Sequence, residues 1–145
     1  MGDEQRLGLS QDAAIVLALA ETAIPFAASP DDEAERWVRV LRLHGQVGAA
    51  LQALGVGEAP LETVAAPPSS YRGEDRRARR QVVGDVAQAA ARFAHGRGAA
   101  MIGTLDVLFA VFQVYGGVFD RALYMRGTSQ AELIERLAAE AELLA

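Results

Sequence analysis

The chain has 145 residues, of which 51% are hydrophobic, so one domain or two intertwined units can bury a core. Only 6% are aromatic, and a core of Ala, Leu and Val favours closely packed helices over a β-sandwich. The net charge of −5 argues against general nucleic-acid binding, and the lack of cysteine excludes disulfides and thiolate chemistry. All 14 basic residues are arginine, so P-loop ATP hydrolysis and Schiff-base chemistry, which need lysine, are also excluded.

The first helix is expected within residues 9–26, with Ser10 as its cap and Pro25 ending or kinking it. A second begins at Ser29-Pro30, and its buried face repeats at i, i+3, i+4 and i+7 as Ala34, Trp37, Val38 and Leu41. Gly45 breaks this helix. A third follows until Gly55, a natural C′ residue, with a short helical turn around residues 61–64.

Residues 65–73 read AAPPSSYRG and form the one clear linker. The next helix is expected from about residue 74 to 95, followed by a loop, GRGAAMIG, and by a helix that Thr104 caps. Its apolar stripe is expected to be Leu105, Leu108, Phe109 and Phe112. Gly116-Gly117 breaks it, a short helix runs to Gly127, and a capping box, Ser129-x-x-Glu132, opens the last helix.

One frame, G-x-x-x-x-A-L-x-x-x-G, occurs twice, at residues 45–55 and 117–127. The apolar stripe before each copy also recurs, at an offset of 71. We therefore expect a tandem duplication of a helical unit of about 70 residues, although Ala- and Leu-rich helices also produce chance matches. The predicted fold is all-α, with two four-helix repeats in residues 1–64 and 76–145, a linker at 65–75, and pseudo-twofold packing into one compact domain.

These residues resemble the Clp repeat, the duplicated amino-terminal domain of Clp/Hsp100 AAA+ unfoldases. In the second half, Ala94-His95 stands at the Gly-His position of that repeat and Ile102-Gly103-Thr104 at its I-G-T. Residues 116–123 cover the glycine break and the following helix. The first half keeps the break helix, QVGAAL and then LGV, but has lost the I-G-T signature. The resemblance spans residues 9–64 and 76–143.

The resemblance implies an all-α pseudo-dimer without chemistry of its own, which docks substrates, degradation signals or adaptor proteins in front of an ATPase ring. The ring is absent here, so the chain is expected to act as a free-standing or excised Clp-N-like module, or to serve an unrelated effector domain. Relatives that read phosphoarginine use the acidic residue of G-T-E-H. Here that position is Leu105, with Asp106 one residue later, which puts phosphoarginine recognition in doubt.

Catalytic, cofactor and metal sites have no support in the sequence. His44 and His95 each stand alone near a helix end, as capping or dipole residues do, without a second ligand at i+3 or i+4. Nucleophile-elbow, H-E-x-x-H and EF-hand motifs are all missing. We expect a protein that is not an enzyme.

Two candidate partner surfaces remain. The first is a run of arginines in an acidic protein, typical either of a solvated helix face or of a patch that docks acidic surfaces through bidentate bonds; it comprises Arg72, Arg76, Arg77, Arg79 and Arg80. The second is the junction at residues 114–119, where Tyr115, with Tyr124 further on, either lines a partner groove or packs between the repeats. Asp106 is a further candidate residue for binding a partner.

The predicted function is therefore a non-catalytic protein-binding module that engages a substrate, an adaptor, an AAA+ unfoldase or an effector domain. The alternative is a regulatory or sensor domain of a multidomain bacterial effector, or a small nucleic-acid-binding protein that uses the patch from Arg76 to Arg80. The N-terminus, MGDEQRLG, lacks the apolar stretch of a signal peptide, and no apolar run reaches the length of a membrane span. We expect a soluble, cytoplasmic protein without a cofactor.

Overall fold

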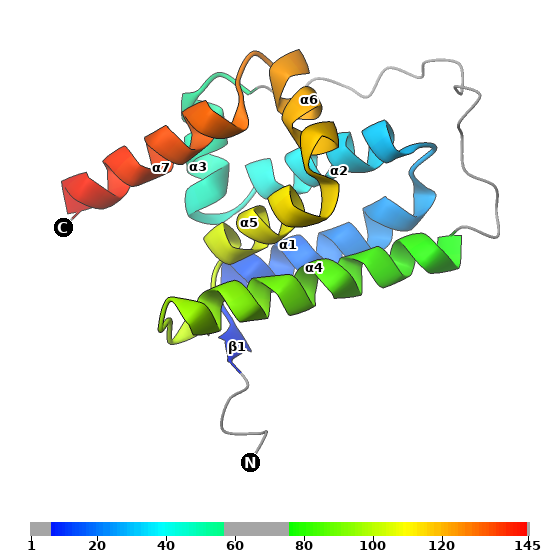
Figure 1. The fold of residues 1–145 in the computed structure, drawn as a ribbon, viewed down its shortest axis with the longest axis horizontal. Helices are drawn as coiled ribbons and strands as arrows, with labels where there is room; N and C mark the ends of the chain where they lie inside the picture. The colour runs from blue at the N-terminus through cyan, green and yellow to red at the C-terminus, as the bar shows by residue number, and fades with distance from the viewer. Residues whose placement is uncertain (1–6, 57–75, 145) are drawn as a thin grey trace.

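The computed structural model describes residues 7–56 and 76–144, with side chains at 7–56 and 81–139. Most described residues are helical, as predicted, and Figure 1 shows their arrangement. The first half contains α1 (Gln11–Ala23), the 3₁₀ turn η2 (Ile24–Phe26), α2 (Pro30–Arg42) and α3 (Gly45–Ala53). The second half contains α4 (Arg76–Gly96), α5 (Thr104–Tyr115), α6 (Gly117–Met125) and α7 (Gln130–Leu144). The helical turn expected at 61–64 and the linker lie outside the described residues.

Short polar side chains start α1 and α2, as the sequence predicts. The Ser10 hydroxyl accepts a hydrogen bond from the Ala13 N–H at 3.1 Å, and the Ser29 hydroxyl accepts one from Asp32 at the same distance. Pro30 occupies the first turn of α2. The α1 helix ends two residues before Pro25, and the chain continues as the 3₁₀ turn. These caps satisfy amide groups that the helix itself leaves unpaired.

The start of α5 differs from the prediction. Gly103 is the N-cap, and Thr104 is already the first helical residue, with only 5% of its surface exposed. The capping bond comes from Asp106, whose carboxylate accepts from the Gly103 N–H at 2.9 Å. A carboxylate at the third helical position can replace the hydroxyl cap, so Thr104 is free to pack into the core.

A two-residue parallel ladder joins the chain's beginning to the loop before α5. Strand β1 (Gly8–Leu9) pairs with β2 (Met101–Ile102), and the Ser10 N–H donates to the Ile102 carbonyl at 2.9 Å. The sequence predicted a plain loop here. Two residues are too few to produce a readable alternation of apolar and polar side chains.

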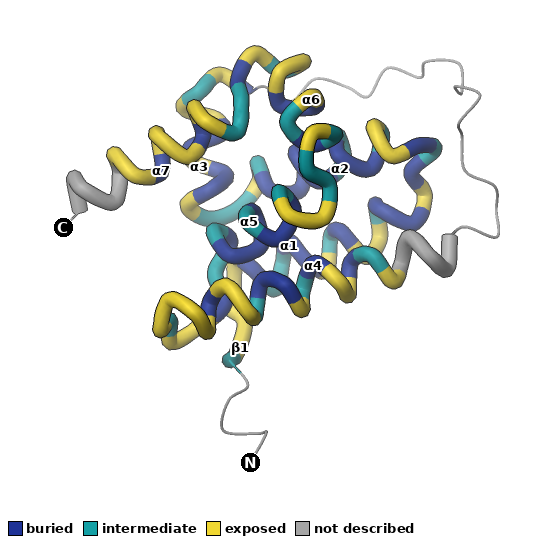
Figure 2. Tube along the Cα trace, in the orientation of Figure 1, coloured by how far each residue is buried: buried dark blue, intermediate teal, exposed yellow. Residues whose placement is uncertain are grey.

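One hydrophobic core unites the two halves of the chain. Helix α5 lies at its centre, in contact with α1, α2, α3, α4 and α6, while α2 also packs on α6 and α3 on α7. The largest fully buried side chains include Trp37 and Phe119, one from each half. Figure 2 shows the buried positions concentrated where α1, α2, α4 and α5 face one another.

The central place of α5 corrects the predicted stripe. Val107 and Val111 are fully buried, whereas Leu105, Phe109 and Phe112 are only partly buried. A helix with five neighbours buries more than one stripe, so spacing alone selects the wrong residues. The remaining predicted member, Leu108, is fully buried.

The α3 and α6 helices, which carry the repeated frame, end alike. Gly55 and Gly127 both have φ +88°, the left-handed conformation that favours glycine. The N–H of the next residue donates to a carbonyl five residues back in both cases, Val56 to Leu51 at 3.0 Å and Thr128 to Leu123 at 3.1 Å. Each glycine thus reverses the chain after a helix of nine residues.

Candidate docking surface

Tyr115, one of the predicted partner residues, is partly buried and is held in place by a hydrogen-bond network between α2 and α5. Its hydroxyl accepts from the Trp37 indole N–H at 2.9 Å and donates to the Glu33 carboxylate at 2.9 Å. Both partners are buried, with 0% and 3% of their surface exposed. The position of Tyr115 therefore matches the packing role that the sequence left open beside the partner-groove role.

Asp106 is fully buried at the start of α5 and bound by Arg97. The Arg97 guanidinium donates two hydrogen bonds to its carboxylate, at 2.8 and 2.7 Å. Burial opposes ionisation, but the bonds from Arg97 and from the Gly103 N–H outweigh it and hold the pKa of Asp106 below its ordinary value. The same contact raises the pKa of Arg97. This carboxylate is committed to an internal ion pair that fixes the loop before α5.

The remaining predicted residues are distributed over other parts of the molecule. Tyr124 lies on α6 with 77% of its surface exposed, beside Met125 at 75%. Four arginines of the run begin α4 at its backbone positions 76–80, while Arg72 lies outside the described residues. The structure does not gather these positions, Tyr115 and Asp106 into one site.

A row of phenylalanine rings crosses from α4 over α5 to α6. Ring centroids are 6.0 Å apart between Phe93 and Phe109, 6.0 Å between Phe109 and Phe112, and 5.6 Å between Phe112 and Phe119. Phe119 is fully buried, Phe109 and Phe112 are partly buried, and Phe93 is 37% exposed. The row therefore runs from the core to the surface, and we call its three accessible members, Phe93, Phe109 and Phe112, the aromatic surface.

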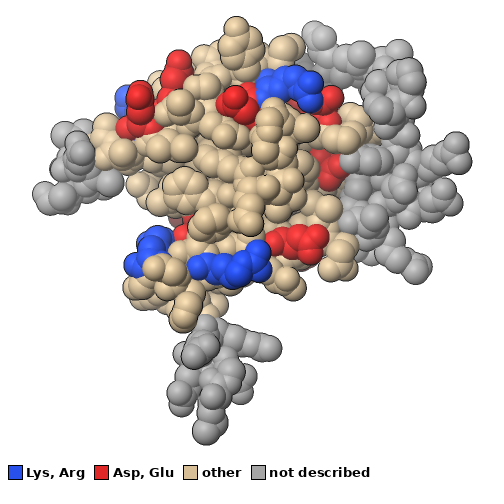
Figure 3. Space-filling model, in the orientation of Figure 1, with Lys and Arg blue, Asp and Glu red and all other residues tan. Residues whose placement is uncertain are grey.

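The part of the aromatic surface that α5 contributes carries no exposed charge. The only charged residue of α5 is Asp106, which is buried, so everything that α5 exposes is uncharged, including Val114 at 40% exposure. Figure 3 shows an uncharged centre on this face, over α5 and the start of α6, with charged groups toward its edges. Apolar centres with polar rims are typical of surfaces that bind other proteins.

The aromatic surface is the strongest candidate site for a partner, and sequence reasoning missed it. The sequence places Phe109 and Phe112 in the apolar stripe of one helix, and the spacing of the four phenylalanines, 16, 3 and 7 positions, gives no sign that they form one row. The groups on this surface suit van der Waals and aromatic contacts rather than proton transfer. Among the described residues, no three His, Asp or Glu side chains come together as a metal site.

Comparisons with known proteins add no relative. No protein-family model matches the chain. No curated protein matches it either. Among the described helices, none combines the length and the apolar composition that crossing a membrane requires.

Proposed function

We propose that the protein is a non-catalytic protein-binding module that captures apolar segments of a partner chain on its aromatic surface. The observation that carries the proposal is a row of three linked phenylalanines, one exposed and two partly exposed, on a face where α5 shows no charge. Aromatic side chains supply much of the binding energy at protein interfaces. The partner is an unfolded substrate or an adaptor segment rich in aliphatic and aromatic residues.

We further propose that the module is of the Clp-N type, built from two copies of one helical unit. Support comes from the closing ends of the two frame segments, which share the same backbone conformation, and from apolar positions 72 residues apart that are buried in both. Val47, Ala50 and Leu51 of α3 are buried, as are Phe119, Ala122 and Leu123 of α6. We expect residues 11–56 and 81–128 to superpose through a twofold rotation, and a failure to do so would remove the kinship with the Clp repeat.

Binding of a permanently unfolded chain tests the docking role. Fluorescein-labelled, reduced and carboxymethylated α-lactalbumin is titrated with the protein and followed by fluorescence anisotropy. Phe93→Gln is expected to weaken binding about tenfold, since it removes the most exposed aromatic anchor of the surface. Ile134→Gln is the matched control, because Ile134 lies on α7 with 41% exposure against 37% for Phe93.

The two variants separate the proposal from general stickiness. Equal losses for Phe93→Gln and Ile134→Gln, or unchanged binding by Phe93→Gln, would show that the aromatic surface is not the docking site. Circular dichroism of both variants verifies the fold. Absence of any binding to the unfolded chain would contradict substrate capture itself.

The arginine run supports a second candidate function, recognition of an acidic partner or a nucleic acid. Arg76, Arg77, Arg79 and Arg80 fall within the first five positions of α4, in a protein whose net charge is −5. A quadruple replacement by Ala is expected to abolish salt-dependent binding to single-stranded RNA if this function holds. If the quadruple variant still binds the unfolded chain, the arginine run is not needed for substrate capture and the two functions are separate.

A further inference from the structure

A small groove between α1 and α2 combines an apolar floor with two arginines. Its volume is about 220 Å³. Ligand pockets usually start near about 300 Å³, whereas a cavity of about 150 Å³ holds a benzene ring, so this one fits a single side chain rather than a cofactor. The apolar lining comes from Leu19 and Ala23 of α1 and from Val40 and Leu43 of α2, with Arg36 and Arg39 as its charged members.

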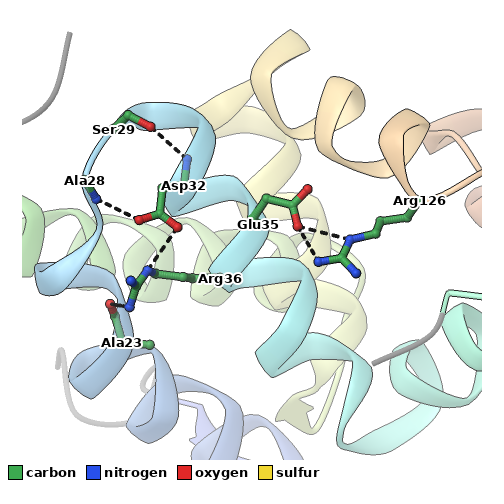
Figure 4. A network of polar contacts seen from close by, with 7 residues as sticks. All are labelled: Ala23, Ala28, Ser29, Asp32, Glu35, Arg36 and Arg126. Atoms are coloured by element: carbon green, nitrogen blue, oxygen red, sulfur yellow. Dashed lines mark hydrogen bonds and ion pairs between the residues drawn. The ribbon is translucent and has the colours of Figure 1, made fainter. Parts of the chain in front are cut away.

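The two arginines differ in what they bind. The Arg36 guanidinium donates to the Asp32 carboxylate at 3.2 Å and to the Ala23 carbonyl at 3.0 Å, which fixes it across the top of α1. Figure 4 shows both contacts and the neighbouring ion pair. Arg36 is therefore part of the groove's wall.

Arg39 has no hydrogen bond or ion pair with any described residue. On an α-helix its natural partner is the carboxylate four positions earlier, Glu35. That carboxylate instead accepts two hydrogen bonds from Arg126, the residue directly after α6, at 3.1 and 2.6 Å. The ion pair drawn in Figure 4 thus takes the partner that Arg39 would otherwise have and leaves its charge at the groove.

We propose that this groove binds the free carboxyl terminus of a protein chain that ends in an aliphatic residue. A terminal residue carries its side chain and its carboxylate on the same carbon, which matches an apolar floor beside a cation. The planar guanidinium of Arg39 binds the carboxylate through two parallel N–H bonds. The Thr22 hydroxyl donates its proton to the Leu19 carbonyl at 2.8 Å and keeps acceptor capacity for the terminal amide N–H.

The occupant follows from size and charge together. A nucleotide or a long acyl chain exceeds the volume, and an internal segment of aliphatic residues has no negative group to meet Arg39. None of the groove residues belongs to the aromatic surface, so this inference does not depend on the proposed function.

The test compares peptides that differ only at the carboxyl terminus. Acetyl-Gly-Ser-Ala-Leu, as free acid or as amide, is titrated into ¹⁵N-labelled protein and followed by amide shifts in NMR spectra. The free acid is expected to move the signals of Ala23, Val40 and Leu43 and to bind about tenfold more tightly than the amide, since charge-assisted hydrogen bonds are lost in the amide.

Variants assign the preference to one side chain. Arg39→Gln is expected to abolish the difference between acid and amide, and Arg39→Lys to reduce it, because an ammonium keeps the charge without the planar fork. Arg92→Gln, which removes an exposed arginine of α4, is expected to leave the difference in affinity between acid and amide unchanged. Trp37 fluorescence reports whether the variants stay folded.

Three results would overturn the inference. They are equal affinity for acid and amide, an acid preference that survives Arg39→Gln, and absence of shifts at the groove with millimolar peptide. A fourth arm uses 4-methylpentanoate, the leucine skeleton without a peptide bond. If this small acid binds as tightly as the peptide, the site accepts free aliphatic acids and the assignment to a chain terminus is wrong.

Discussion

The two copies of the frame G-x-x-x-x-A-L-x-x-x-G end in the same way but begin differently. Gly55 and Gly127 share φ +88° and the same carbonyl contact. At the other end, Gly45 has φ +76°, and a Cβ placed on it would lie 2.8 Å from the Thr104 hydroxyl. Gly117 has no such strain, and a Cβ placed on it would meet no atom within 4 Å in the described part of the chain. One sequence frame therefore contains two glycines with different physical requirements.

This difference shows what each end contributes. The closing glycines serve the local chain reversal, which depends only on the backbone. The opening glycine of the first copy serves the packing of α3 against α5, since an added Cβ would collide with the buried Thr104 side chain. In the second copy, the residues just before the frame are anchored instead by Tyr115. Its hydroxyl forms hydrogen bonds with Trp37 and Glu33 on α2.

The largest effect is expected from Gly45→Ala, with a loss of about 3 kcal/mol in the free energy of unfolding. Left-handed strain and the collision with Thr104 both contribute. Gly117→Ala is expected to change stability by less than about 1 kcal/mol, with either sign. Urea unfolding followed by Trp37 fluorescence measures both.

A double-mutant cycle isolates the collision. Thr104→Ala removes the two side-chain atoms nearest to the new Cβ, so Gly45→Ala is expected to cost less in that background. Additive losses would show that packing against α5 is not the reason for the glycine.

Tyr115→Phe is expected to lower the free energy of unfolding by about 2 kcal/mol, because it removes a hydroxyl that joins two buried polar groups. Tyr124→Phe is the control, since Tyr124 is 77% exposed and its loss should stay below about 0.5 kcal/mol. Equal losses of unfolding free energy in the two variants would mean that the hydroxyl of Tyr115 does not anchor the segment before the second frame to α2.

Asp106→Asn is expected to cost about 1.5 kcal/mol at neutral pH, because Arg97 and Gly103 hold the ionised carboxylate at the loop on which Gly45 packs. The pKa of Asp106 is lowered by folding, so its stabilisation is complete above the unfolded value of about 3.9 and is lost as the pH falls through the folded value. The difference in the free energy of unfolding between wild type and Asp106→Asn should therefore shrink toward acid pH. Urea midpoints at pH 7 and pH 3 measure it, and a constant gap would contradict the assignment.

The smallest effects are expected at the closing glycines. Gly55→Ala and Gly127→Ala should each cost about 1 kcal/mol, since both have positive φ and neither has a described atom within 4 Å of an added Cβ. The two losses should agree within about 0.5 kcal/mol, as judged by thermal and urea unfolding. A clear difference would show that the similarity of the two helix ends is superficial.

Local chemistry explains which predictions succeed. Ser10, Ser29 and Gly55 act as caps because the groups that they satisfy lie within a few residues of each of them. Ser129 caps α7 as predicted, with a 3.1 Å bond from the Glu132 N–H, but the Glu132 carboxylate accepts from the Thr128 hydroxyl instead of returning to the cap. The Thr128 hydroxyl competes with the Ser129 backbone N–H for the Glu132 carboxylate. The capping-box pattern does not predict which of the two donors binds it.

The candidate sites were less predictable, because each depends on elements far apart in the chain. The aromatic surface needs α4 and α5 side by side, and the charge of Arg39 stays available at the groove because Arg126, 91 positions after Glu35, takes that carboxylate. Arg39 looks in the sequence like any solvated arginine on a helix. Spacing rules cannot predict pairing of this kind, because they apply to residues within a single helix.

The helical character, most helix boundaries and the glycine that closes each frame could be predicted from the amino-acid sequence, because caps, breaks and φ preferences are short-range properties of the backbone. The packing of the helices was needed to show that α5 is the central helix, that Gly45 rather than Gly117 is packed against it, and that Arg39 is left without a charged partner among the described residues. Those outcomes arise from contacts between helices, whose free energies depend on all neighbours of a residue at once.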